Sequence, residues 1–264
     1  MKKIELITLD HSCKIGDDCP TIEPNIKEDC IFFSEGKAIG FFLRSLPPRA
    51  ASLADLADYE LRSKNVPKNG TRRATTEGWD EEKQKYKYSK EVVQHSTIIG
   101  AVIPKPHMRR PYPSMSSVHG VRSARPFIKA MLLLAKESEK IIADILPEQH
   151  QRQAELFEQV PDKWKFGNLF TSSISNFNIS AGFHRDTGNI PETVNVIITK
   201  RRNSHGGNLH IPDYGATIDQ CDRSILVYPA WRNVHGVTPI IPTQKDGYRN
   251  SLVFYPLKAF MNLS

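Results

Sequence analysis

The chain has 264 residues, with 36 Lys and Arg against 29 Asp and Glu, a net charge of +7 and a pI near 9.2. A hydrophobic share of 39% is enough for an ordinary core, so wholesale disorder is excluded, and four cysteines are too few for a disulfide-rich secreted scaffold. The positive charge leaves two interpretations open: a surface that is merely basic, or a polyanionic partner.

Residues 1–45 are expected to form a polar arm followed by a hairpin. The arm carries Cys13, Cys19 and Cys30. Reduced thiols are the default reading, and a small metal knuckle that includes His11 is the alternative. Over residues 31–43, two apolar runs flank Ser-Glu-Gly-Lys, which predicts a β-hairpin.

The chain shows no targeting or membrane segment. Its first residues lack the apolar region of a signal peptide, and the longest apolar stretch, residues 130–135, is too short to span a bilayer. We therefore expect a soluble, intracellular protein without a membrane partner, in a host cytoplasm or a nucleus according to its source.

Residues 46–165 are expected to be a helical support region with basic loops. Apolar periodicity predicts three helices, over residues 52–64, 126–146 and 148–160. The charged segment 67–90 is predicted to be a mobile loop or a segment that orders on a ligand, and four prolines exclude regular structure over residues 104–117. The basic clusters are Arg72–Arg73, His107–Arg109–Arg110 and, further on, Lys200–Arg201–Arg202.

After residue 165 the pattern changes to short apolar runs separated by turn residues. Several strands at this spacing, with no helical periodicity between them, predict a double-stranded β-helix, or jelly roll, as the core over residues 166–264. The predicted fold class is therefore α+β, with N-terminal helices that support a C-terminal jelly roll in one compact catalytic unit.

One constellation in this β-region carries chemistry. His184 and Asp186 stand two positions apart, so their side chains lie on the same face of a strand, and His235 follows at another predicted strand end. Two imidazoles and one carboxylate form the facial triad that suits Fe(II) and leaves coordination positions open. Arg249 follows, and an arginine there can bind the remote carboxylate of a 2-oxo dicarboxylate. For the H-x-D motif alone, the alternative is a solvent-exposed histidine and aspartate in a loop.

The segments FTSSISNFN, HRDTGN, GGNLHIPDY, DRSILVYPAWRNVHGV and YRNSLVFY together resemble the TET/JBP family of Fe(II)- and 2-oxoglutarate-dependent oxygenases. That family oxidises the 5-methyl group of pyrimidines in DNA. The resemblance is densest over residues 170–255. It implies catalytic iron ligands at His184, Asp186 and His235, and 2-oxoglutarate contacts from Arg249, Ser251 and His210.

The resemblance also implies a substrate site. Asn189 matches an asparagine that hydrogen-bonds the target base, and Tyr255 matches a tyrosine that stacks on it, while Arg72 and Arg73 are candidates for DNA or co-substrate. Asn189 is equally well read as a turn residue, and Tyr255 as a core residue. The sequence departs from the animal enzymes at Leu257, where they carry a second base-reading histidine, and it lacks their Cys-rich insert. It is therefore expected to be a compact viral or microbial member.

The implied function is hydroxylation of 5-methylcytosine to 5-hydroxymethylcytosine in duplex DNA, with Fe(II), 2-oxoglutarate and O₂, on a flipped base. The alternatives are thymine hydroxylation to 5-hydroxymethyluracil, a free nucleotide substrate, a protein or small-molecule substrate, and an inactive jelly roll that only binds DNA. A monomer is favoured.

Overall fold

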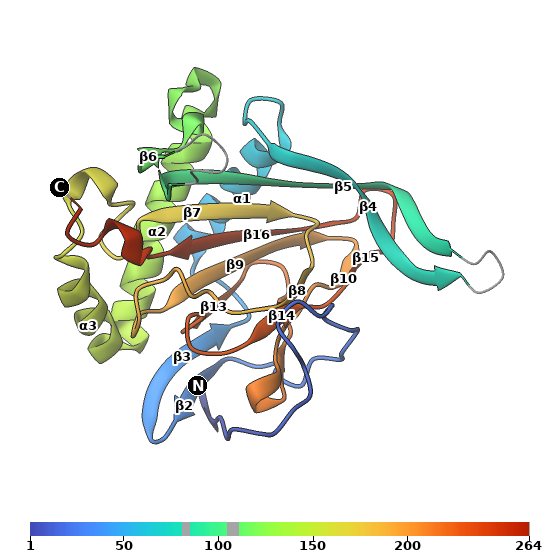
Figure 1. The fold of residues 1–264 in the computed structure, drawn as a ribbon, viewed down its shortest axis with the longest axis horizontal. Coiled ribbons are helices and arrows are strands. Elements are labelled where there is room, and N and C mark those ends of the chain that lie inside the picture. Colours follow the sequence, from blue (N-terminus) through green and yellow to red (C-terminus); the bar gives the residue numbers. More distant parts are fainter. Residues whose placement is uncertain (81–84, 105–110, 264) are drawn as a thin grey trace.

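Two β-sheets face each other, and helices cover the outer side of the larger sheet (Figure 1). The structure is a computed structural model that describes residues 1–80, 85–104 and 111–263, with side chains described outside 69–92. In the described chain no helix is both long and apolar enough to cross a membrane. This arrangement confirms the predicted α+β class with a jelly-roll core.

The larger sheet, here the major sheet, is mostly antiparallel. Its strands are, in spatial order, β1 (Lys2–Glu5), β2 (Cys30–Ser34), β3 (Lys37–Leu43), β13 (Ser224–Tyr228), β9 (Asn195–Arg202), β16 (Tyr248–Tyr255), β7 (Ser172–Phe177), β5 (Lys85–Val102) and β4 (Asn69–Asp80), with β6 (Ser114–Met115) paired to β5. The smaller, minor sheet contains β12 (Ala216–Ile218), β11 (Leu209–Ile211), β14 (His235–Val237) and β8 (Ala181–His184). A separate ribbon pairs β10 (Ser204–Gly206) with β15 (Ile240–Pro242).

The main hydrophobic core lies between the major sheet and the helices. The three predicted helices are present as α1 (Pro48–Arg62), α2 (Arg125–Ile145) and α3 (Pro147–Phe157). Phe127, Met131 and Leu134 recur at helical spacing on α2 and are fully buried, together with Leu252 and Phe254 of β16. Because side chains alternate along a strand, the other residues of β16 point to the opposite face, toward the minor sheet.

The N-terminal arm is more ordered than its polar composition suggested. Residues 2–5 form β1, which pairs in parallel with β2. Further along, the backbones of Gly16 and Asp17 exchange hydrogen bonds with Phe183 of β8 at 2.8 Å, and Ile26 bridges to Ile218 of β12. The arm therefore covers both edges of the minor sheet, which would otherwise expose unpaired backbone groups.

The prediction of a mobile loop over residues 67–90 is wrong, and the exclusion of regular structure over residues 104–117 fails at its end, where Ser114–Met115 form β6. In the first of these segments the chain forms β4 and the start of β5, a long hairpin that extends from the edge of the major sheet (Figure 1). Its charged composition hid the strand pattern, because apolar alternation marks only strands with one buried face. The partition of the chain at residues 45 and 165 stays a prediction, although strands from all three segments belong to the major sheet.

Candidate metal centre

The pairing of β8 with β14 brings two histidines together at one end of the space between the sheets. His184 and His235 are direct cross-strand partners, and their ring centroids lie 4.3 Å apart. Asp186 follows β8, where its backbone N–H donates to Ala230 O at 3.1 Å. One ligand atom from each of the three side chains lies within 4.8 Å of the others, and no other such group of His, Cys, Asp and Glu occurs among the described residues.

Both histidine rings of the triad are held by a hydrogen bond at Nδ1. His184 Nδ1 contacts Gly182 O at 2.8 Å, and His235 Nδ1 contacts Asn233 O at 3.0 Å. A carbonyl oxygen only accepts, so both rings carry their proton on Nδ1 and present the Nε2 lone pair. This arrangement of outer hydrogen bonds is typical of metal-binding histidines, and the residues fit a divalent ion.

Burial sets the protonation of this group. Burial, and next the neighbouring His184, lowers the pKa of His235 to about 3, so its imidazole is neutral at physiological pH. Burial also raises the pKa of Asp186, against the effects of His184 and a hydrogen bond from Asn195. The ring of Tyr228 stands edge-on to His235, and its buried hydroxyl has no hydrogen-bond partner among the described residues.

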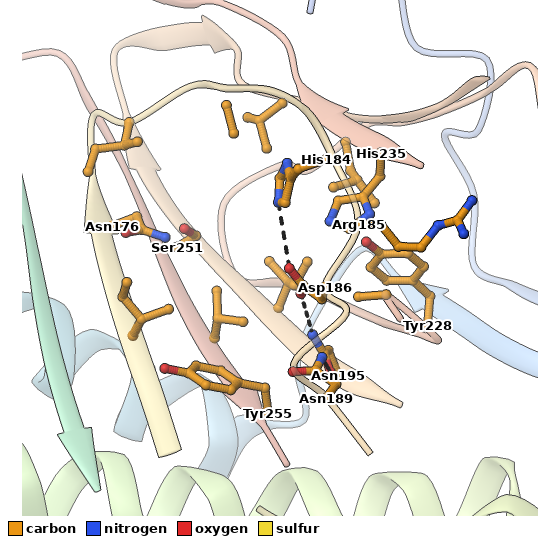
Figure 2. Close-up of a pocket in the computed structure, with 18 of the residues that line it drawn as sticks. Asn176, His184, Arg185, Asp186, Asn189, Asn195, Tyr228, His235, Ser251 and Tyr255 are labelled. Carbon is orange, nitrogen blue, oxygen red and sulfur yellow. Dashed lines mark hydrogen bonds and ion pairs between the residues drawn. The ribbon is translucent and has the colours of Figure 1, made fainter. Parts of the chain in front are cut away.

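A cavity of about 450 Å³ opens from the triad between the two sheets (Figure 2). Alternation along β16 directs Arg249, Ser251 and Tyr255 into it. Ser251 pairs with Asn176 of β7, which also lines the cavity. The structure therefore brings three predicted site residues from one strand to the same space as the triad.

Arg249 is a buried cation without an acidic partner among the described residues. Its side chain is 1% exposed, and its Nη2 donates to Gln220 Oε1 at 2.5 Å. Burial, and next repulsion from Arg201, lowers the pKa of Arg249 to about 9, so the guanidinium is still charged at neutral pH. A Cβ at Gly207, where φ is +64°, would collide with Arg249 Cδ, so only glycine leaves room for this side chain.

Two buried donors at this end of the cavity have no hydrogen-bond partner among the described residues. They are Nε of Arg249 and Nε2 of Gln220, and both residues line the cavity. A buried donor without a hydrogen-bond partner destabilises the folded protein. Two such donors, next to the positive charge of Arg249, suit a carboxylate ligand. Sequence reasoning missed Gln220, because it lies in the loop between β12 and β13, where no strand periodicity indicates its direction.

The structure does not bring His210 into this cavity. Leu209 lines the cavity, and alternation turns the next side chain of β11 to the other face of the minor sheet. There His210 Nδ1 contacts Thr217 Oγ1 at 2.8 Å, and its ring stands edge-on to Phe183. The expected contact between His210 and the co-substrate is therefore not supported by this arrangement.

A line of amides extends from the triad along the cavity wall. Asn195 Nδ2 donates to Asp186 Oδ2 at 3.0 Å, and Asn189 Nδ2 donates to Asn195 Oδ1 at 2.8 Å (Figure 2). Leu257 bridges to Asn189 and lines the same wall, as does Tyr255. The structure thus brings the two predicted base-contact residues and the divergent leucine together, and it adds Asn195, which the sequence analysis did not select.

The structure places the three basic clusters in different surroundings. Arg72 and Arg73 lie on β4, where backbone but not side chains are described, and residues 107–110 lie outside the described residues. The cluster at residues 200–202 is at the end of strand β9, where its charged side chains have partners within the protein. Lys200 is paired with Asp55 and Asp222, Arg201 donates to two backbone carbonyls, and Arg202 is paired with Asp246.

Comparisons with known proteins agree with this geometry. A family model described as the oxygenase domain of the 2OGFeDO superfamily, Tet_JBP, matches residues 106–258. The chain is similar to a solved structure described as NgTET1 in complex with 5mC DNA, with 13% identity and a TM-score of 0.58 over 94% of this chain and 84% of that chain. This likeness supports the jelly-roll fold.

Two further structures are similar at 13% identity. One is a 2OG-Fe(II) oxygenase family oxidoreductase from Burkholderia pseudomallei, with a TM-score of 0.46 over 82% of each chain. The other is a full-length Neurospora crassa protein in complex with alpha-KG, with a TM-score of 0.42 over 82% of this chain and 75% of that chain. No curated protein matches the sequence.

Proposed function

The chain belongs to the Tet/JBP family of oxygenase domains in the 2OGFeDO superfamily, and from this premise we propose that it hydroxylates the 5-methyl group of 5-methylcytosine in DNA. It is a 2-oxoglutarate- and Fe(II)-dependent dioxygenase. One observation supports the finer assignment: a single cavity combines the His-Asp-His group, an unpaired buried arginine and a wall of amide and aromatic side chains.

In this proposal His184, Asp186 and His235 hold Fe(II). Arg249 Nε, Gln220 Nε2 and the Ser251 hydroxyl receive the far carboxylate of 2-oxoglutarate, which supplies the negative charge that Arg249 lacks. When bound, Fe(II) and 2-oxoglutarate activate O₂ and supply the oxidising power for hydroxylation of a C–H bond. The protein positions both groups and excludes water.

The remaining wall of the cavity would hold the base. Tyr255 offers an aromatic face for stacking, and Asn189 offers a polar group for the edge of the ring. The side chains of Arg185 and the Thr187–Gly188 turn are exposed and line the same cavity, so they mark its mouth. A methyl group within a duplex cannot reach a buried metal, so the target nucleotide would flip out and enter here.

The proposed partner is methylated duplex DNA, bound by a monomer inside the cell. Arg185 lies between the metal ligands His184 and Asp186 in the sequence and is exposed, so it is available to contact a phosphate of the flipped nucleotide. Thymine is the second candidate base, because Leu257 provides no hydrogen-bonding group that would distinguish the two pyrimidines.

Nucleoside mass spectrometry tests the proposed function. Duplex DNA that contains both 5-methylcytosine and thymine is incubated with enzyme, Fe(II), 2-oxoglutarate and O₂, then digested to nucleosides. We expect 5-hydroxymethylcytosine to form and to require all three additions. Unchanged pyrimidines, with full 2-oxoglutarate turnover on a protein or metabolite, would contradict the DNA assignment.

The carboxylate site predicts an unusual response to Gln220→Glu. The new carboxylate can pair with the uncompensated guanidinium of Arg249, so we expect a higher melting temperature in the absence of co-substrate. It should also repel the incoming carboxylate and weaken 2-oxoglutarate binding at least about 100-fold, or about 2.7 kcal/mol. Thermal melts and calorimetric titration with 2-oxoglutarate in the presence of Mn(II) measure the two effects.

The matched control is Gln153→Glu. Gln153 is equally buried, but it bonds backbone groups of Leu169 and Val194 beneath the sheet, with no described cation beside it. A buried carboxylate without a partner is destabilising, so this variant should melt at a lower temperature and keep its affinity for 2-oxoglutarate. Equal destabilisation by both substitutions would contradict the carboxylate site.

A further inference from the structure

A chain of three side chains joins the metal centre to the substrate wall. Asn195 is the first residue of β9 and is 2% exposed. It uses both halves of its amide: Nδ2 donates to Asp186 Oδ2 at 3.0 Å, and Oδ1 accepts from Asn189 Nδ2 at 2.8 Å. Figure 2 shows Asn195 between the metal ligand and the residue proposed to read the base.

The direction of every hydrogen bond in this chain follows from its first member. A metal-binding carboxylate is ionised and only accepts, so Asn195 must turn its NH₂ group toward Asp186. Its oxygen then faces Asn189, which must in turn donate through its own NH₂ group. Asn189 is 4% exposed and lines the cavity, and no described residue donates to its Oδ1. The group left for a ligand is therefore an acceptor.

The same residue lies close to the metal end of the cavity. Asn189 N donates to the backbone oxygen of Asp186 at 3.0 Å, in addition to the side-chain connection through Asn195. A 5-methylpyrimidine must direct its methyl group at the metal. On the ring, the methyl-bearing carbon has two neighbours: C6, which carries only hydrogen, and C4, which carries an amino group in cytosine and an oxo group in thymine.

We propose that Asn195 is a positioning residue that makes the site select an amino-pyrimidine over an oxo-pyrimidine. This inference rests on the proposed function and deepens it. Asn195 holds Asn189 so that its amide oxygen accepts from the C4 amino group of 5-methylcytosine and opposes the C4 oxygen of thymine. Leu257, across the bridge from Asn189, can neither donate nor accept, so it does not offset this selection.

Two substitutions at residue 195 separate its effect on base selection, through Asn189, from its effect on metal binding, through Asp186. Asn195→Leu removes both hydrogen bonds, so the amide of Asn189 is free to rotate and present its NH₂ group to thymine. Asn195→Asp keeps an acceptor for Asn189 and therefore keeps its orientation, but it places a second carboxylate beside Asp186. The readouts are the ratio of kcat/KM for 5-methylcytosine to that for thymine in otherwise identical duplexes, and the Kd for Mn(II).

We expect the wild-type enzyme to favour 5-methylcytosine by about 10-fold or more, the effect of one matched against one opposed hydrogen bond. Asn195→Leu should lower that ratio about 10-fold, whereas Asn195→Asp should preserve it. Both variants should weaken Mn(II) binding about 10–100-fold, as expected when a partner of a metal ligand is lost.

The control is Asn250→Leu. Asn250 is also buried, but its amide donates to Asp58 of α1 on the far face of the major sheet. This variant should lose stability without any change in base preference or Mn(II) affinity. If the wild-type enzyme oxidises DNA but Asn195→Leu leaves its base ratio unchanged, the inference is wrong while the proposed function stands. If neither base is oxidised, the proposed function is wrong, and the inference with it.

Discussion

Asp186→Ala is expected to reduce turnover by more than about 1,000-fold, because it removes the one anionic ligand of the proposed iron site. The fold should persist, because Asp186 belongs to the turn after β8 and its backbone bond to Ala230 is unaffected. Succinate release, with Fe(II) content measured on the same sample, checks both statements. Loss of the carboxylate also leaves the NH₂ group of Asn195 without its acceptor, so a modest decrease in melting temperature should accompany the loss of iron.

A surface aspartate provides the comparison. Asp246 pairs with Arg202 in an exposed loop between β15 and β16. Asp246→Ala should keep wild-type iron content and turnover, because exposed ion pairs contribute little. Full succinate production by Asp186→Ala would contradict the assignment of iron to this triad.

Arg249→Leu is expected to weaken 2-oxoglutarate binding at least about 100-fold, because it removes the charge-assisted hydrogen bond from Nε, about 1.5–3 kcal/mol, together with the positive charge that attracts the carboxylate. The apo protein should not be destabilised to a similar degree. Its guanidinium has a single described side-chain partner, Gln220, and lies near the like-charged Arg201. A leucine at this position removes an uncompensated buried charge. Calorimetric titration with 2-oxoglutarate and Mn(II) measures the affinity, and a thermal melt without ligand measures the stability.

The matched variant is Arg202→Leu, which removes an exposed arginine of the neighbouring strand β9. Its affinity for 2-oxoglutarate should equal that of the wild-type protein. If Arg249→Leu leaves the affinity for 2-oxoglutarate unchanged, Arg249 is a structural residue, and a large loss of apo stability should then accompany the substitution.

Strand periodicity explains why much of the site could be predicted from sequence. Two residues that are two positions apart on a strand share a face, which placed His184 with Asp186 near one point. The same rule explains why Arg249 lines one cavity with Ser251 and Tyr255 of β16, which were expected there from the family resemblance. Each of these relations is local, so it needs no knowledge of the tertiary fold.

The features that were missed or misplaced depend on the tertiary fold and not on local sequence. His210 was expected at the co-substrate from the family resemblance alone, and a motif match does not state which face of β11 its side chain takes; the structure places it outside the cavity, against Thr217. Gln220 lies in a loop, and Asn195 acts through contacts with other segments of the chain, so neither has a local signal. The polar arm gains its strand β1 by pairing with β2, and the charged hairpin forms by pairing of β4 with β5, whose later residues join β7. That pairing leaves no mark in their own composition.

The central claim is that one cavity joins a 2-oxoglutarate-dependent iron centre to a methylated base. Coupled stoichiometry tests it most directly: succinate and 5-hydroxymethylcytosine are measured in the same reaction, with methylated duplex and with an unmethylated duplex of the same sequence. We predict that methylated DNA accelerates succinate formation and that about one succinate forms for each hydroxymethyl group. Succinate formation at the same rate with both duplexes, without any oxidised cytosine, would contradict the claim.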